Sequence, residues 1–160
     1  MSQIFPATSS DQIEQVRDLF REYQAELEVS HCLRGMDEEI AGLPGAYAPP
    51  QGRLLLATVL GQPAGCVGLR PFLLEGVCEM KRLFVRPTFR GGKVGRLLVE
   101  QVLQDAKALG YRSIRLDTYP VTMQAAIAMY RRFGFREISS APLAPVEGLL
   151  YMECGLVWQK

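Results

Sequence analysis

The chain has 160 residues, 48% hydrophobic and 22% charged, which is the composition of a folded globular protein and excludes a disordered segment. Eighteen Lys and Arg against seventeen Asp and Glu give a net charge of +1, so no overall field attracts nucleic acid or an anionic membrane. The amino terminus lacks a signal-peptide pattern and no apolar run could span a bilayer, so we expect one cytoplasmic domain over residues 1–160, without nucleic-acid or membrane partners.

The first part of the chain predicts two helices. Apolar residues at steps of three and four over residues 11–29 predict an amphipathic helix, and Asp11 followed by Glu14 resembles a capping box at its start. A short helix over residues 36–41 should end at the Gly-Leu-Pro-Gly run that follows it. Residues 46–52 contain two prolines and predict a loop.

The rest of the chain alternates strand and helix patterns. Strands are predicted over residues 54–60, 66–72, 77–85, 113–118, 135–138 and 149–157. Helices are predicted over residues 95–109 and 122–133. Short turns join the first three strands, which predicts an antiparallel meander. The pattern favours an α/β domain with a mixed sheet and helices on its faces.

The four cysteines form no CxxC pair, and the single histidine, His31, cannot complete a recognisable zinc set with them. The sequence therefore predicts neither a metal site nor a disulfide framework. We interpret cysteines with apolar neighbours as small core residues.

Residues 81–98 combine a strand, a proline-marked turn, a loop rich in Gly and Arg, and a helix. Free backbone N–H groups and the positive end of a helix dipole favour an anion at such a loop, and glycines let a phosphate approach the backbone. Around the loop itself, positive charge comes from Arg90, Lys93 and Arg96. The motifs GxGxxG and GxxxxGK[ST] are absent, so a diphosphate outside the dinucleotide and P-loop classes is the favoured guest; a flexible glycine turn is the alternative.

This segment resembles the GNAT superfamily of N-acetyltransferases, whose diphosphate-binding signature is [QR]xxGx[GA]. Arg90 and Gly95 match the signature, and its central glycine falls on Lys93. Residues 126–135 resemble the family's NxxAIxLYxxxGF block, whose asparagine falls on Met123. Both blocks occur in the expected order and spacing, so the chain is identified as similar to this superfamily.

The resemblance implies an α/β fold in which a mixed, mostly antiparallel sheet splays into a V-shaped slot, with helices on both faces. Coenzyme A would lie in the slot, its pantetheine amides paired with the strand at residues 83–85 and its diphosphate held by residues 90–96. The implied cofactor-binding residues are Leu83, Phe84, Val85, Arg90, Gly91, Gly92, Lys93, Val94, Gly95 and Arg96. The implied co-substrate is acetyl-CoA, with no metal.

Two residues are candidates for catalysis. Glu79 lies six residues before Val85, where some members of the superfamily carry a glutamate base acting through water; an ion pair with Lys81 or a nearby arginine is the alternative. Tyr130 occupies the family's tyrosine position and could protonate the departing thiolate; a core aromatic is the alternative.

The expected activity is acetyl transfer from acetyl-CoA, by direct attack, to a primary amine of a small molecule or amino acid. Protein N-terminal or lysine acetylation, or a non-catalytic acyl-CoA-binding regulatory module, are the alternatives. The acceptor side is expected near His31, Cys32, Arg34 and residues 37–39, which a solvated helix end explains equally well, and near the loop 139–148. A homodimer is an expectation from the resemblance alone.

Overall fold

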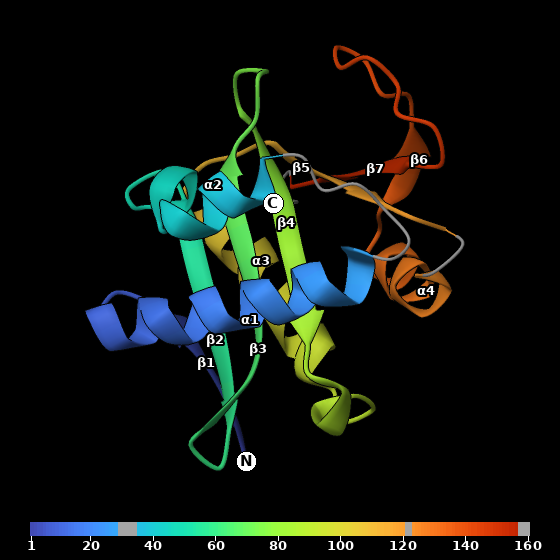
Figure 1. Ribbon diagram of the computed structural model, residues 1–160. Helices are drawn as coiled ribbons and strands as arrows, with labels where there is room; N and C mark the ends of the chain where they lie inside the picture. Colours follow the sequence, from blue (N-terminus) through green and yellow to red (C-terminus); the bar gives the residue numbers. More distant parts are fainter. Residues whose placement is uncertain (29–34, 121–122, 157–160) are drawn as a thin grey trace.

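The computed structural model describes residues 1–28, 35–120 and 123–156. Seven strands form one sheet in the order β1-β2-β3-β4-β5-β7-β6 (Figure 1). Their bounds are Ser2–Pro6 (β1), Arg53–Val59 (β2), Gln62–Pro71 (β3), Val77–Val85 (β4), Ser113–Thr118 (β5), Arg136–Ile138 (β6) and Leu150–Gly155 (β7). The β4–β5 pairing is parallel, and the other neighbouring strands pair antiparallel. This is the predicted mixed, mostly antiparallel sheet.

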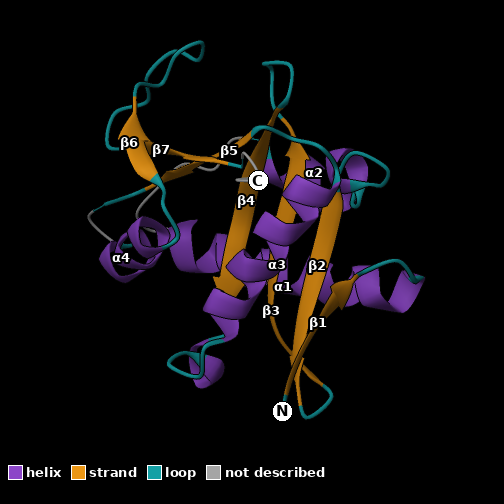
Figure 2. Cartoon of the chain, turned by 180° about the vertical axis from the view of Figure 1, so that it is seen from behind, coloured by secondary structure: helices purple, strands orange, loops and turns teal. Residues whose placement is uncertain are grey.

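Helices cover both faces of the sheet (Figures 1 and 2). Their bounds are Ser10–Glu28 (α1), Met36–Ala41 (α2), Val94–Ala108 (α3) and Gln124–Arg132 (α4), with short 3-10 turns at Gly45–Tyr47 and Pro87–Phe89. The helices α1 and α2 pack on one face, and α3 and α4 contribute to the hydrophobic cluster on the other.

The strand β2 shows why two core layers form. Leu54 and Leu56 join the cluster under α1 and α2, while Leu55 and Ala57 join the cluster under α3. Alternate side chains of a strand point to opposite faces, so a strand covered on both sides is a continuous apolar run. The apolar stretch in the sequence is therefore a central strand.

The start of α1 corrects one prediction. The N–H of Gln12 donates to Ser9 Oγ at 3.2 Å, and the N–H of Ser9 donates to Gln12 Oε1 at 3.1 Å. These reciprocal bonds are a capping box, so the box predicted at Asp11 and Glu14 is wrong. The helix begins at Ser10, which places Asp11 inside its first turn.

Two strands also differ from prediction. The strand β1 pairs with β2 along all five of its residues, although so short a segment carries no strand pattern of its own. The strand β3 begins at Gln62, four residues before its predicted start, because Leu60 and Gly61 form a two-residue turn with φ of 50° and 79°. The other predicted elements agree within two residues where the structure describes them.

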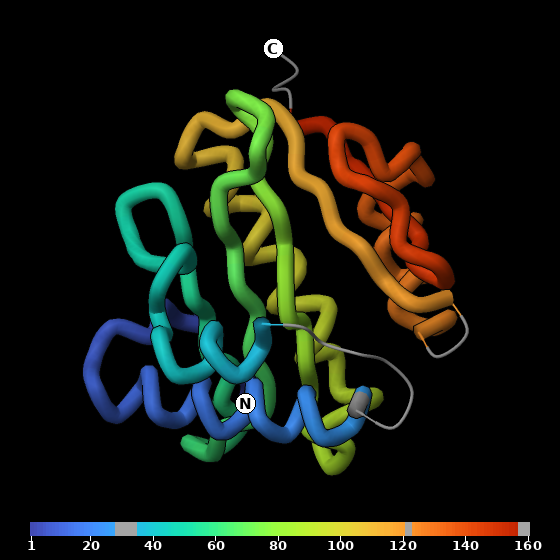
Figure 3. Tube along the Cα trace, turned by 45° about the horizontal axis from the view of Figure 1, so that its top comes forward, coloured from blue at the N-terminus to red at the C-terminus, as the bar shows by residue number. Residues whose placement is uncertain are grey.

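The parallel pair β4–β5 opens the sheet. The two strands pair at three positions, of which Glu79 opposite Arg115 is the last. Beyond this pair β4 continues to Val85 and β5 to Thr118 along diverging paths (Figure 3). This divergence is the predicted V-shaped splay.

Candidate active site

A β-bulge reshapes β4 where it leaves β5. Cys66 of β3 pairs with Phe84, but Gly68 pairs with Lys81, so Arg82 and Leu83 together face a single residue of β3. Arg82 has a φ of 61°, a left-handed conformation that is uncommon outside glycine. Bulges re-aim side chains and interrupt strand pairing, which is why they occur beside active sites.

A cavity of about 480 Å³ occupies the opening between β4, α1, α3 and α4. It is lined by Tyr23, Glu26, Leu27, Leu83, Phe84, Val85, Phe89, Arg90, Gly91, Lys93, Gly95, Arg96, Met123, Ala125, Ala126, Met129 and Tyr130. Three of these residues carry a positive charge and one a negative charge, so the lining has a net charge of +2. We call this cavity the slot. Its net charge suits a doubly charged anion such as a diphosphate.

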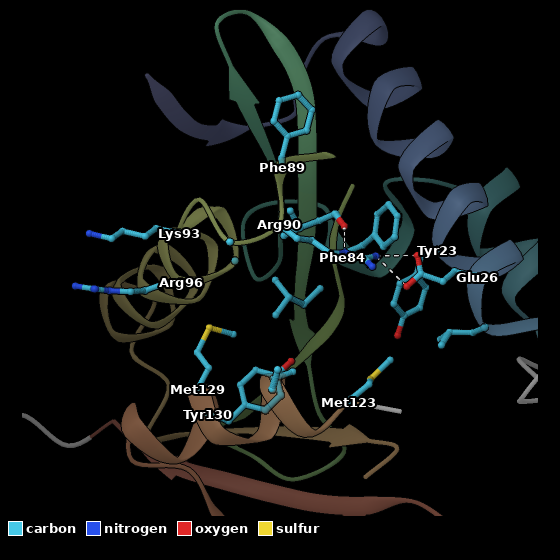
Figure 4. A pocket seen from close by; sticks show the side chains of 17 residues that line it. Tyr23, Glu26, Phe84, Phe89, Arg90, Lys93, Arg96, Met123, Met129 and Tyr130 are labelled. Atoms are coloured by element: carbon cyan, nitrogen blue, oxygen red, sulfur yellow. Dashed lines mark hydrogen bonds and ion pairs between the residues drawn. The ribbon is translucent and has the colours of Figure 1, made fainter. Parts of the chain in front are cut away.

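The cationic end of the slot lies at the start of α3. The first helical hydrogen bond runs from the N–H of Leu97 to the carbonyl of Lys93, which leaves the preceding N–H groups of the first turn without helical partners. Lys93 and Arg96 extend from this turn away from Arg90, and Arg96 reaches Glu100 (Figure 4). Orphan N–H groups beside cationic side chains make an anion site.

Arg90 is held by α1 across the slot. Its Nη2 lies 2.7 and 2.9 Å from the two carboxylate oxygens of Glu26, and its Nε donates to the carbonyl of Val85 at 2.8 Å (Figure 4). One turn earlier on α1, Glu22 pairs with Arg86 at 2.6 Å, outside the slot. The carboxylate of Glu26 therefore binds the guanidinium of Arg90, which is the guanidinium best placed to bind a phosphate.

Two tyrosines lie on opposite sides of the slot, Tyr23 on α1 and Tyr130 on α4 (Figure 4). Burial raises the pKa of Tyr23 to about 12 and raises the pKa of Tyr130 as well, because a phenolate would lose its hydration. Among the described residues, neither hydroxyl has a hydrogen-bond partner. Both groups remain protonated donors near neutral pH.

A smaller cavity continues from the slot between β4 and β5. Its lining includes the charged side chains of Lys81, Arg82 and Asp117. The two cavities share four residues: Tyr23, Leu83, Met123 and Tyr130. We call the smaller cavity the charged chamber; a group placed there would lie beside a ligand in the slot.

Comparison with known proteins identifies this arrangement. The model of the Acetyltransferase (GNAT) family matches residues 13–135. The chain belongs to this family. An uncharacterized N-acetyltransferase of Schizosaccharomyces pombe is 39% identical over 135 residues, covering 84% of this chain and 82% of that protein.

Solved structures share the fold. An acetyltransferase of the GNAT family from Staphylococcus aureus superposes with a TM-score of 0.82 at 20% identity, over 98% of this chain and all of that one. A protein from Salmonella typhimurium, solved with its cofactor acetyl-CoA, superposes with a TM-score of 0.76 at 16% identity, over all of this chain and 96% of that one. The predicted family, fold and acyltransferase class are confirmed.

The loop before α3 carries a lysine at a backbone position that suits glycine. Lys93, where the family signature has a glycine, has a φ of 70° and caps α3 in the left-handed conformation that glycine adopts without strain. Gly91 has a φ of 87°. The lysine adds a charge to the loop at the cost of local backbone strain.

Most predicted cofactor-binding residues come together. Eight of the ten line the slot: Leu83, Phe84, Val85, Arg90, Gly91, Lys93, Gly95 and Arg96. Gly92 and Val94 do not, and Val94 is buried in the core beneath α3. Tyr130 lines the slot, whereas Glu79 lines neither cavity.

The acceptor-side predictions are only partly covered. His31, Cys32 and Arg34 lie outside the described residues. Glu39 is engaged by Arg82 at 2.9 Å. The loop 139–148 is tied to the sheet, because the buried Arg115 of β5 donates to the carbonyls of its first three residues.

Several residues around the site are not predicted from the sequence: Tyr23, Glu26, Lys81, Arg82 and Asp117. Tyr23 belongs to the apolar stripe of α1, which predicts packing and not a place in a cavity. Met123, at the family's asparagine position, accepts a hydrogen bond from Thr118 through its Sδ at 3.2 Å.

Three cysteines, Cys66, Cys78 and Cys154, are buried, as predicted for small core residues. Burial raises the pKa of the Cys78 thiol to about 12, so it is not a thiolate near neutral pH. In the described ranges, no group of three His, Cys, Asp or Glu side chains could hold a metal ion. Nor is any described helix long and apolar enough to cross a membrane.

Glu79 has a partner that bears on its role. It is 6% exposed, and its Oε1 accepts from Arg70 Nε at 3.1 Å. The guanidinium of Arg70 occupies one carboxylate oxygen of Glu79, which is the kind of contact that the ion-pair alternative predicts. This contact favours the ion-pair alternative, while catalysis by Glu79 stays a hypothesis.

We expect Glu79→Gln to keep the wild-type pH–rate profile and acetyl-CoA affinity, and to lower the melting temperature by weakening the contact with Arg70. The measurements are initial rates between pH 6 and 9.5 and a thermal melt. A mutant whose rate is reduced and rises more steeply toward alkaline pH would instead show that Glu79 is the base.

We expect Glu26→Gln to raise acetyl-CoA affinity about two- to fivefold, because it removes a negative charge from the diphosphate end and releases Arg90. This is the scale of a half-exposed charge contact. Calorimetric titration measures it. Glu22→Gln, which removes the matching pair outside the slot, should leave the affinity unchanged. Weaker binding by Glu26→Gln would show that Glu26 holds Arg90 in its binding position.

Proposed function

We propose that the protein transfers the acetyl group of acetyl-CoA to a primary amine of a small molecule by direct attack. The observation that carries the proposal is the slot at the β4–β5 splay, with a cationic helix start at one end and a buried tyrosine at the other. The family assignment independently supports acetyl transfer.

In this proposal, the coenzyme lies along β4. The bulge at Arg82 and the divergence of β5 leave the edge of residues 83–85 facing the slot, where pantetheine amides can pair with it as a strand would. The diphosphate lies at residues 90–96, against Arg90 and the first turn of α3. The acetyl thioester then lies near the four residues that the slot and the charged chamber share.

The reaction needs a neutral amine. An alkyl ammonium with the pKa of a lysine is mostly protonated at pH 7, a deficit of roughly 4–5 kcal/mol. After deprotonation, the nitrogen attacks the thioester carbonyl carbon, the C–S bond breaks, and sulfur leaves with the electron pair. The nitrogen then loses its second proton to solvent, the thiolate accepts a proton from a donor that solvent reprotonates, and the net reaction releases one proton.

Tyr130 is the proposed donor to the thiolate. Its hydroxyl is buried in the slot, protonated, and without a hydrogen-bond partner among the described residues. A buried hydroxyl without a partner loses its hydration, and it gains most when a charged acceptor forms beside it. The leaving sulfur is such an acceptor.

Release of free CoA thiol from acetyl-CoA across a panel of small amines, amino acids and amino-terminal peptides tests the proposal. We expect turnover with small amines and a mass increase of one acetyl group on the product. Turnover with peptides alone would assign the protein to protein acetylation. Tight acetyl-CoA binding without turnover on any acceptor would support a regulatory binding module. A cytoplasmic location and a homodimer stay predictions.

A further inference from the structure

Lys81 and Asp117 face each other across the gap where the sheet opens. Each lies two residues beyond the last β4–β5 pair, so both side chains project from the same face as Glu79 and Arg115. Lys81 Nζ lies 3.3 and 3.4 Å from the two carboxylate oxygens of Asp117. The side chains are 12% and 22% exposed, so this ion pair is partly withdrawn from water.

This pair has hydrogen-bonding capacity to spare. An ammonium has three donors and a carboxylate about four acceptor positions, yet among the described residues these two groups bind only each other. The charged neighbour Arg82 differs, because it binds both oxygens of Glu39 at 2.9 and 3.1 Å. Within the charged chamber, Lys81 and Asp117 are therefore the charges available to a ligand.

The pair also lies at the right place for an acceptor. Both residues line the charged chamber, which joins the slot at Tyr23, Leu83, Met123 and Tyr130. The coenzyme enters from the α3 side of this junction. An acceptor whose charged end occupies this chamber of about 40 Å³ would approach the thioester from the opposite side, as direct attack requires.

We propose that Lys81 and Asp117 bind the acceptor, and that the acceptor carries a carboxylate beside its amine, as an α-amino acid does. This inference rests on the proposed acetyltransferase function. The two opposite charges of such a zwitterion complement the ion pair: the ammonium binds Asp117 before it loses its proton, and the carboxylate binds Lys81. A simple amine has no carboxylate to bind Lys81, and its ammonium would be repelled by the positive charge of Lys81. A peptide amino terminus offers a neutral amide at the same position.

Matched acceptors test the charge requirement. For each of several L-amino acids, kcat/KM for CoA thiol release is compared with that of its α-amide and of the amine lacking the carboxyl group. We expect the acid to exceed both by about tenfold or more, the scale of a hydrogen bond to a charged group. Chemistry alone favours the amide, because its amine is less basic and is more often neutral.

Variants assign the preference to Lys81. We expect Lys81→Met to lower kcat/KM for the acid at least tenfold more than kcat/KM for the amide. Lys81→Arg should restore much of the preference for the acid. Lys107→Met, outside both cavities, is the matched control. If Lys81→Met does not fold, the comparison of acid and amide with the wild-type protein still tests the requirement for a carboxylate.

Two results would overturn the inference. Turnover of amides or simple amines equal to or better than that of the acids refutes the carboxylate requirement and leaves the acetyltransferase function standing. A folded Lys81→Met that keeps the preference for acids refutes the role of Lys81. Turnover of no acceptor, with acetyl-CoA binding intact, overturns the proposed function and this inference together.

Discussion

Tyr130→Phe should lower kcat by about 10²-fold or more, the usual scale for removing a general acid. The hydroxyl lies in the slot and the ring packs on Phe135 at a centroid distance of 5.7 Å, so the substitution keeps the packing and removes only the donor. No described residue loses a hydrogen bond, so the melting temperature should stay close to that of the wild type. Steady-state rates and a thermal melt measure both quantities.

Tyr111→Phe is the control for this prediction. The Tyr111 hydroxyl donates to the carbonyl of Gln51 at 2.7 Å and lies outside the slot and the charged chamber. This variant should lose some stability and keep its kcat. Normal turnover by Tyr130→Phe would show that Tyr130 is a core aromatic and that another group protonates the thiolate.

The double variant Arg90→Ala with Gly95→Glu should weaken acetyl-CoA binding about 100-fold or more. It removes one phosphate-binding guanidinium and adds a carboxylate where the phosphates bind, each a change on the scale of a charged hydrogen bond. The fold should persist: a Cβ at Gly95 would lie 3.6 Å from Val85 Cγ2, an ordinary contact, and an acidic residue in the first turn of α3 suits the helix dipole. Calorimetric titration measures the affinity.

A matched control carries the same change in net charge away from the slot. Arg21→Ala with Gln104→Glu alters two exposed positions on α1 and α3 and also lowers the net charge by two. Its acetyl-CoA affinity should be close to that of the wild type. Unchanged affinity in a folded Arg90→Ala/Gly95→Glu variant would refute the assignment of the diphosphate to this loop.

The sequence predicts most elements because their signals are local. The stripe of α1, the apolar run of β2 and the glycines of the hairpins act within about ten residues of chain. One error has the opposite origin: the strand β1 forms through its pairing with β2, about fifty residues away. The other error is local, because the capping box uses Ser9 where Asp11 is an equally good candidate by residue type.

The site likewise has one part that a local sequence pattern indicates and another part that depends on contacts between distant residues. The diphosphate loop lies within residues 81–98, so one contiguous pattern indicates it. The contacts of Glu26 with Arg90 and of Lys81 with Asp117 join residues 64 and 36 positions apart, and no local pattern indicates either. They arise because α1 lies across from the loop that follows β4, and because Lys81 and Asp117 lie two residues beyond the last β4–β5 pair.

A structure of the protein with bound CoA tests the account most directly. We predict that the pantetheine arm pairs with the backbone of residues 83–85, that the diphosphate lies against Arg90 and the first turn of α3 with Glu26 displaced, and that the thiol lies within hydrogen-bonding distance of the Tyr130 hydroxyl. A coenzyme bound outside the slot, or in the slot with its thiol remote from Tyr130, would contradict it.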